Sequence, residues 1–244
     1  MKNLYLWNYI LVFLCASLFS LVSCNTDADL NTYEPSHDAF YRVGTLLPTN
    51  DDNPYDIIGI VYDELFESYY SSDSLDGTIL EIANKVQNIA DSNSNFNALK
   101  KTTYQGVCIS CVEYIIDHQS TCVFEIISDS NMSRNAKASL NEFTTSFISL
   151  FNHEQDDAIL NQTLVAYERD VLESYLLTEA DKEIILTSTS ILRYTSYRAK
   201  KKPKKNTDPD WTILVGNIAS SIEGSYYGPA EAVIRALVTG IAQN

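Results

Sequence analysis

Three cysteines and a histidine are the residues whose types and spacing come closest to a chemical site. Cys108, Cys111, His118 and Cys122 follow the pattern C-x₂-C-x₆-H-x₃-C. Four ligands of this kind are what a structural Zn²⁺ site requires. The stretch around them is apolar, however, whereas such ligands usually lie in loops. The four residues are therefore candidates for a metal site with an unusual spacing, and no other cofactor is predicted.

The same three cysteines are disulfide candidates, because exported proteins commonly form disulfides. One thiol is then left over. A bond between Cys108 and Cys111 would join residues one helical turn apart and restrain little, whereas a bond from Cys122 to either of them would hold a turn. A third interpretation, in which all three are small buried side chains, stays open.

No residue set predicts catalysis. His153-Glu154-Gln155-Asp156-Asp157 lacks the second histidine that a zinc-protease helix needs. Acidic residues favour the positive N-terminal end of a helix, so this cluster is interpreted as a helix start. The chain has three histidines, none of them near a suitable nucleophile. A non-enzymatic protein is predicted.

The N-terminus has the order of regions found in a secretory signal: Lys2, an apolar segment over 4–22, and small residues before a cysteine. Leu21-Val22-Ser23-Cys24 resembles the bacterial lipobox, in which the cysteine becomes the lipidated N-terminus. Residues 1–23 are therefore predicted to be a lipoprotein signal peptide, with lipid on Cys24. Acyl chains anchor a protein without a membrane-spanning helix.

The alternative for residues 4–22 is an uncleaved membrane-spanning anchor, since about 20 apolar residues cross a bilayer. Asn8 interrupts the segment, and the lipobox lies where cleavage is expected. Asp27 and Asp29 follow the cysteine, as acidic residues do in the surface-export signal of Bacteroidota lipoproteins. The predicted location is the outer membrane, and the choice between its cell-surface and periplasmic faces stays open.

Charge is distributed unevenly. Residues 25–192 carry 28 acids against 8 bases, so binding to nucleic acid is not expected, because phosphate contacts need Lys and Arg. Residues 193–209 form a predicted basic loop that includes Arg193 and Arg198. Its lysines are either contacts for anionic lipid or another polyanion, or parts of a solvated loop. They are Lys200, Lys201, Lys202, Lys204 and Lys205.

The remainder of the chain predicts an all-α fold, a single domain of about six to eight helices over 53–244. Residues 24–52 are polar and aperiodic and are predicted to be a lipidated flexible tether. Asn53-Pro54, Thr78 and Thr178-Glu179-Ala180-Asp181 are expected helix starts. The range 103–127 is predicted to contain a helix, followed by either a short strand or the helix end.

Small residues repeat every fourth position near the C-terminus. They are Gly216, Ser220, Gly224, Gly228, Ala232, Ala236 and Gly240. Such a ridge lets two helix backbones approach closely, so residues 210–244 are predicted to form a tightly packed helical hairpin interrupted at Pro229. The alternative is a membrane-inserting glycine zipper, although each half is shorter than the ~20 residues that span a bilayer.

Two further features concern the surface. Asp73-Ser74-Leu75 resembles the short O-glycosylation sequon of Bacteroidota, which makes Ser74 a glycosylation candidate. The tyrosines Tyr69-Tyr70, Tyr194, Tyr197 and Tyr226-Tyr227 either form an aromatic binding surface or pack along helix faces.

Several local patterns together resemble a group of uncharacterised exported lipoproteins of Bacteroidota. The residues that carry the resemblance are Asn53-Pro54-Tyr55-Asp56, Gly59, Glu64, Met132-Ser133, Ala136-Lys137, Thr178, Lys182, Thr187, Ile191, Arg193-Tyr194 and Ser196-Tyr197. Tyr62-Asp63 departs from the His-Asn expected in relatives, and the tail has fewer glycines. The resemblance implies an all-α fold and export, and it implies no activity.

The predicted function is therefore an interaction or envelope role for a lipid-anchored helical protein. Its partners are the membrane, through the lipid, and a protein or glycan. The first alternative is a membrane-active effector, toxin-like or bacteriocin-like, that uses the C-terminal hairpin and the basic run. The second alternative is a hydrolase that uses the Cys/His or acidic residues.

Overall fold

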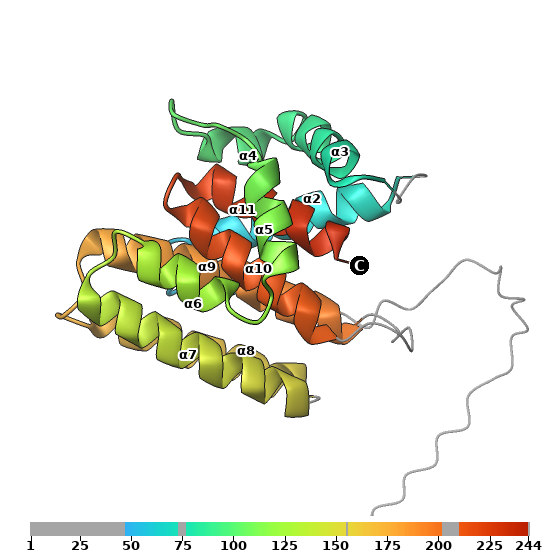
Figure 1. Cartoon of the computed structure of the whole chain (residues 1–244). Helices are drawn as coiled ribbons and strands as arrows, with labels where there is room; N and C mark the ends of the chain where they lie inside the picture. The colour runs from blue at the N-terminus through green and yellow to red at the C-terminus, as the bar shows by residue number, and fades with distance from the viewer. Residues whose placement is uncertain (1–46, 73–76, 155, 202–209, 244) are drawn as a thin grey trace, which may run out of the picture. The chain divides into compact units, whose positions relative to one another are not determined.

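The computed structural model describes residues 47–72, 77–154, 156–201 and 210–243, and within them it is helical throughout (Figure 1). The predicted all-α fold is confirmed. The described residues form ten helices instead of six to eight, because the chain between 94 and 129 folds as three short ones. The helices are α2 (Asp56–Tyr70), α3 (Ile79–Asp91), α4 (Ser94–Leu99), α5 (Ile109–Asp117), α6 (Cys122–Asp129), α7 (Arg134–His153), α8 (Asp157–Glu173), α9 (Glu179–Lys201), α10 (Asp210–Ser225) and α11 (Pro229–Ala242).

Two expected helix starts are confirmed by reciprocal caps. The Thr78 side chain accepts a hydrogen bond from the Glu81 backbone, and the Glu81 carboxylate accepts one from Thr78 in return. Thr178 and Asp181 make the same exchange at the start of α9. Each exchange satisfies two backbone donors that a helix start otherwise leaves unpaired.

The start expected at Asn53-Pro54 lies about two residues too early, because α2 begins at Asp56. Asn53 is buried, and its amide donates to the Leu186 carbonyl of α9 at 3.1 Å. Its side-chain oxygen accepts the Tyr55 backbone N–H at 2.9 Å. The residue that was expected to cap the helix instead forms the turn before it and fastens that turn to α9.

The structure also differs from two segment boundaries that were predicted from polarity, the end of the tether and the start of the basic loop. The tether was predicted to end at residue 52, but Pro48 and Asn50 are already buried in the domain. The basic loop was predicted to start at residue 193, but α9 continues through Lys201. The strand alternative within 103–127 is wrong, since α5 and α6 are both helices and a turn around His118 separates them.

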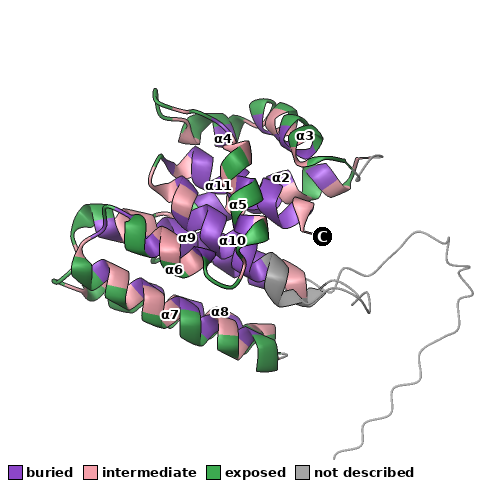
Figure 2. Ribbon diagram, viewed as in Figure 1, coloured by how far each residue is buried: buried purple, intermediate pink, exposed green. Residues whose placement is uncertain are grey.

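The centre of the bundle is made by α9, α10 and α11 (Figure 2). Every residue of α11 from Ala230 to Ile241 is buried, so this helix is enclosed on all sides, and its charged residues Glu231 and Arg235 are buried with polar partners. One core cluster joins α11 to α2 and α3, and a second joins α9 and α10 to α7 and α8.

The predicted tight packing of the C-terminal hairpin is confirmed. A Cβ atom on Gly224 would lie 2.6 Å from both the Ala232 Cα atom and the Glu231 carbonyl oxygen, closer than atoms pack. The Ser220 and Thr239 hydroxyls also lie 2.6 Å apart across the two helices. The small residues therefore set the distance between α10 and α11.

We expect Gly224→Ala to lower the free energy of unfolding by about 2 kcal/mol, because the added methyl group meets helix backbone that cannot rotate away. Thermal unfolding followed by circular dichroism measures the loss. Ser146→Ala, on the exposed surface of α7, also leaves an alanine inside a helix and serves as the control. Equal melting temperatures for the two variants would contradict the close approach.

Candidate functional site

Several of the predicted site residues lie outside the described residues. They are Cys24, Ser74, Lys202, Lys204 and Lys205. Of Lys200 and Lys201 only the helical backbone at the end of α9 is described. Lipidation, glycosylation and contact of the lysines with a polyanion therefore stay predictions.

The structure does not bring the four metal candidates together as one set of ligands. Cys108 and Cys111 form a disulfide, while Cys122 is a free, fully buried thiol. His118 is exposed, and its Nδ1 atom lies 2.9 Å from the Tyr114 carbonyl oxygen. Across the described ranges, no group of three or more His, Cys, Asp or Glu residues is placed to hold a metal ion.

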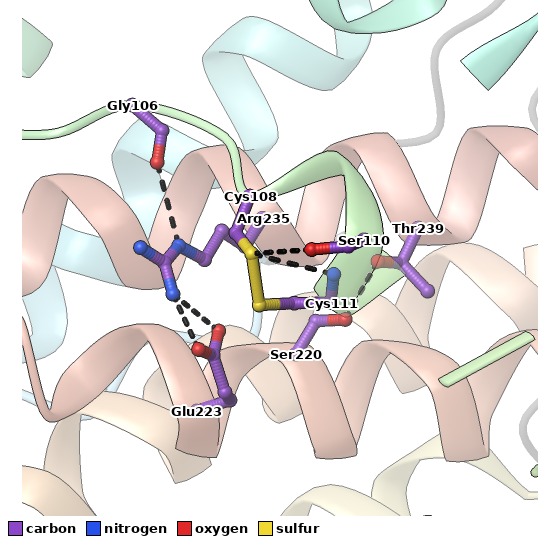
Figure 3. The surroundings of a disulfide bond; sticks show 8 residues. All are labelled: Gly106, Cys108, Ser110, Cys111, Ser220, Glu223, Arg235 and Thr239. Carbon is purple, nitrogen blue, oxygen red and sulfur yellow. Dashed lines mark hydrogen bonds and ion pairs between the residues drawn. A yellow bond between two sulfur atoms is a disulfide. The ribbon is translucent and has the colours of Figure 1, made fainter. Parts of the chain in front are cut away.

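The disulfide lies at the N-terminal end of α5 (Figure 3). Cys108 is the residue that caps the helix, and its sulfur accepts the Cys111 backbone N–H at 3.3 Å. The Ser110 hydroxyl lies 3.5 Å from the same sulfur. Both cysteines are partly exposed. The bond closes a loop of only about four residues, so the lost entropy of the unfolded chain stabilises the fold by roughly 2 kcal/mol. Both cysteines lie at the start of α5, so the bond does not connect one helix to another.

The segment before Cys108 is held by α11. The buried Arg235 donates to the Gly106 carbonyl at 3.4 Å and pairs with Glu223 of α10 (Figure 3). The Gln105 backbone N–H donates to Glu231 at 3.0 Å. Gly106 has a φ of 74°, a conformation that glycine adopts without strain. The loop that positions the disulfide is therefore fixed to the centre of the bundle.

The acidic cluster at 153–157 lies where α7 ends and α8 begins. α7 ends at His153, whose ring Nδ1 atom lies 2.8 Å from the Ser149 carbonyl oxygen. Asp156 caps α8 by accepting the Ala158 backbone N–H at 2.9 Å. This arrangement confirms the expected helix start. His153 and Asp156 contribute to the end of α7 and the start of α8.

The tyrosines do not form one continuous surface. Tyr69 and Tyr194 are buried in the core, so a binding role for their rings is wrong. The Tyr226 hydroxyl donates to the Ile126 carbonyl at 3.2 Å, and only the ring of Tyr227 is substantially exposed in that pair. Packing along helix faces, the second of the two interpretations, accounts for most of them.

A buried ion network centred on Arg193 was not predicted from the sequence. Its guanidinium pairs with Asp56 of α2 and, at 3.1 Å, with Glu168 of α8, and it donates to the Pro48 carbonyl. The Asn50 amide donates to Glu168 at 2.6 Å. Arg193 and Glu168 are both fully buried, so the residue that was assigned to a basic loop is in fact part of the core.

A groove between α2 and α3 has a volume of about 740 Å³. Amide, hydroxyl and charged side chains line it, together with Ile89. The polar lining residues are Ser68, Ser72, Glu81, Asn84, Lys85, Asn88, Ser92 and Asn93. Among them, Asn84 and Asn88 project from successive turns of α3, and both are exposed.

The other polar groups of the groove are held in place by the fold. The Asn93 amide donates to Glu64 at 3.0 Å, and the Asn93 oxygen caps α4. The Ser92 hydroxyl donates to the Asn88 carbonyl at 3.1 Å, which leaves its oxygen available as an acceptor. Within the described residues no hydrogen bond engages the Asn84 or Asn88 amide. Hydrogen bonds thus hold Ser92 and Asn93 of the groove in place, while the amides of Asn84 and Asn88 are available to a ligand.

Comparison of the chain with protein-family models, with curated proteins and with solved structures finds no match. No described helix has both the length and the apolar character needed to cross a membrane.

We expect Arg193→Met to destabilise the protein by about 3–5 kcal/mol, because it leaves Asp56 and Glu168 buried without their cation. Urea unfolding measures the change. Arg169→Met, on the exposed face of α8, is the matched control and should change stability by less than about 0.5 kcal/mol. If the two variants unfold at the same urea concentration, the network does not hold the three helices together.

Proposed function

We propose that the protein is an exported lipoprotein of the outer membrane whose helical domain binds a hydroxyl-rich ligand, such as a glycan, in the groove between α2 and α3, without catalysing a reaction. The observation that carries the proposal is the groove itself, with its fixed polar walls and the unengaged amides of Asn84 and Asn88.

The chemistry of the lining favours this class of ligand. Side-chain amides and hydroxyls both donate and accept hydrogen bonds, as the hydroxyl groups of a sugar do. Glu81 and Lys85 contribute one charge of each sign, so the lining is close to neutral and offers little to a polyanion or a polycation. Ile89 adds a small apolar surface for the carbon face of a ring.

Two observations support export and anchoring. The sequence ends its apolar segment with the lipobox cysteine Cys24. The disulfide between Cys108 and Cys111 supports an oxidising compartment, since reducing systems keep most such pairs open in the cytosol. The two observations come from distant parts of the chain, and both support export.

The alternative, a membrane-active effector, would have to use a hairpin that lies at the centre of the fold. Releasing α11 would break the contacts of Arg235 and Glu231 with residues 105 and 106 and expose the core cluster that joins α11 to α2 and α3. The packing role of the hairpin explains its small residues directly. Membrane activity stays a prediction.

In cells supplied with radiolabelled palmitate, we expect the full-length chain to be labelled and Cys24→Ala to carry no label, because the acyl chains attach at that cysteine. Immunoprecipitation followed by autoradiography reads the result. Cys122→Ala is the control and should keep its label. Label that persists in Cys24→Ala would remove the lipid anchor from the proposal.

On a glycan array, we expect the chain to retain a set of glycans that the double variant Asn84→Ala/Asn88→Ala binds at least ~10-fold more weakly. The loss of two hydrogen-bonding amides accounts for this change, at roughly 1 kcal/mol each. Asn152→Ala, an equally exposed asparagine at the end of α7, is the matched control. Unchanged binding in the double variant would place any glycan elsewhere, and an array without binding would overturn the glycan assignment.

A further inference from the structure

The bond between Cys108 and Cys111 contributes little to holding the helices together. Both cysteines belong to the first turn of one helix, and the bond closes a loop with a sequence separation of 3. α5 is attached to the core by Val112 and Ile115, each 1% exposed, and these contacts do not need the disulfide. α5 is therefore attached to the core independently of the disulfide.

The surroundings of Cys108 are suited to a thiolate. Its sulfur already accepts the Cys111 backbone N–H and lies beside the Ser110 hydroxyl, and both can donate to a negatively charged sulfur (Figure 3). The positive end of the α5 dipole adds to their effect, and such positions make cysteines reactive. The loop before Cys108 is held by Arg235 through the Gly106 carbonyl, so the sulfur keeps its position in either redox state.

The third thiol of the region has the opposite character. Cys122 is fully buried between α6 and α10, and burial raises the pKa of its thiol to about 11. It stays protonated at neutral pH and does not compete for the disulfide. The reactive unit is therefore the pair of Cys108, whose sulfur caps α5, and Cys111 one turn later.

We propose that Cys108 and Cys111 form a thiol–disulfide exchange site that takes two electrons from a dithiol of another exported protein. This activity is separate from the groove and goes beyond the proposed binding function. A thiolate of the partner attacks the Cys108 sulfur, the bond to Cys111 breaks, and Cys111 leaves with the bonding electron pair and takes a proton from water. A mixed disulfide between the partner and Cys108 results.

In the second step the partner forms its own disulfide and is released from Cys108. Its other thiolate attacks its own sulfur in the mixed disulfide, and Cys108 leaves as a thiolate held by the Cys111 N–H and the Ser110 hydroxyl. The partner has lost two electrons and two thiol protons, and the pair on α5 has gained the electrons. A second disulfide of the compartment restores the bond between Cys108 and Cys111 by the same exchange in reverse, and it takes up the two electrons and two protons.

The first test places the full-length chain, in detergent, in glutathione buffers of increasing reduced-to-oxidised ratio. A short maleimide pulse then labels free thiols, and mass spectrometry reads the tryptic peptide 102–134, which contains all three cysteines. We expect Cys108 and Cys111 to pass from unlabelled to doubly labelled across the series, while Cys122 stays unlabelled. A pair that stays closed at every ratio would show a structural disulfide and overturn the proposal.

Circular dichroism of the reduced chain separates exchange from unfolding. We expect its helical signal to be unchanged and its melting temperature to fall by no more than about 8 °C, in keeping with the short loop that the bond closes. Loss of helix on reduction would mean that the bond holds the fold, and the proposal would fail.

Single-cysteine variants show which of the two cysteines has the more reactive thiolate. With oxidised glutathione at pH 7, Cys111→Ser should form a mixed disulfide at Cys108 at least ~10-fold faster than Cys108→Ser forms one at Cys111, because only Cys108 occupies the capping position. Equal rates would remove the assignment of Cys108. Ser110→Ala should slow the Cys111→Ser reaction while leaving the melting temperature unchanged.

Discussion

The ion network around Arg193 is the interaction on which the arrangement of the outer helices depends. One guanidinium at the middle of α9 binds carboxylates from α2 and α8 and the Pro48 carbonyl. Removing these charges from water costs several kcal/mol per ion, so the network is stable only with all its partners in place. It therefore sets the positions of α2 and α8 against α9, and it fixes residues 48–50 as part of the domain.

The central helices add a second constraint, because they carry many hydroxyl groups into the core. On α9 the Ser188 and Thr195 hydroxyls donate to carbonyls of the preceding turn at 2.8 and 3.0 Å. Ser190 instead reaches across to α2, where it accepts the Gly59 N–H and donates to the Asp56 carbonyl. A Cβ on Gly59 would lie 2.5 Å from that hydroxyl, so the same contact requires a glycine. Small and polar residues thus allow close packing where large apolar ones would hold the helices apart.

The sequence predicts those parts of the fold that rest on local rules. Periodicity places the long helices and α3, a capping box places the start of α9, and the spacing of small residues identifies the hairpin. Arg193 was misassigned because a basic residue near five lysines resembles a solvated run, and its partners Asp56 and Glu168 are 137 and 25 residues away. The groove was missed for the same reason, since Asn84 and Asn88 look like ordinary exposed residues until α2 is placed beside α3. Pairing over long sequence distances has no local signal.

The three cysteines between 108 and 122 show how backbone position, more than residue type, decides chemistry. Cys122 is on a buried helix face among Ile115, Val215 and Ala219, where a charged sulfur would lose its solvation. Cys108 is at a helix start, where unpaired N–H groups point outward and stabilise negative charge. Cys111 follows one turn later on the same helix, within bonding distance of Cys108 by helical geometry alone. The sequence left the pairing of the three cysteines open, and the structure joins Cys108 to Cys111. Only the cap at Cys108 makes the two sulfurs different, and an exchange site requires that difference.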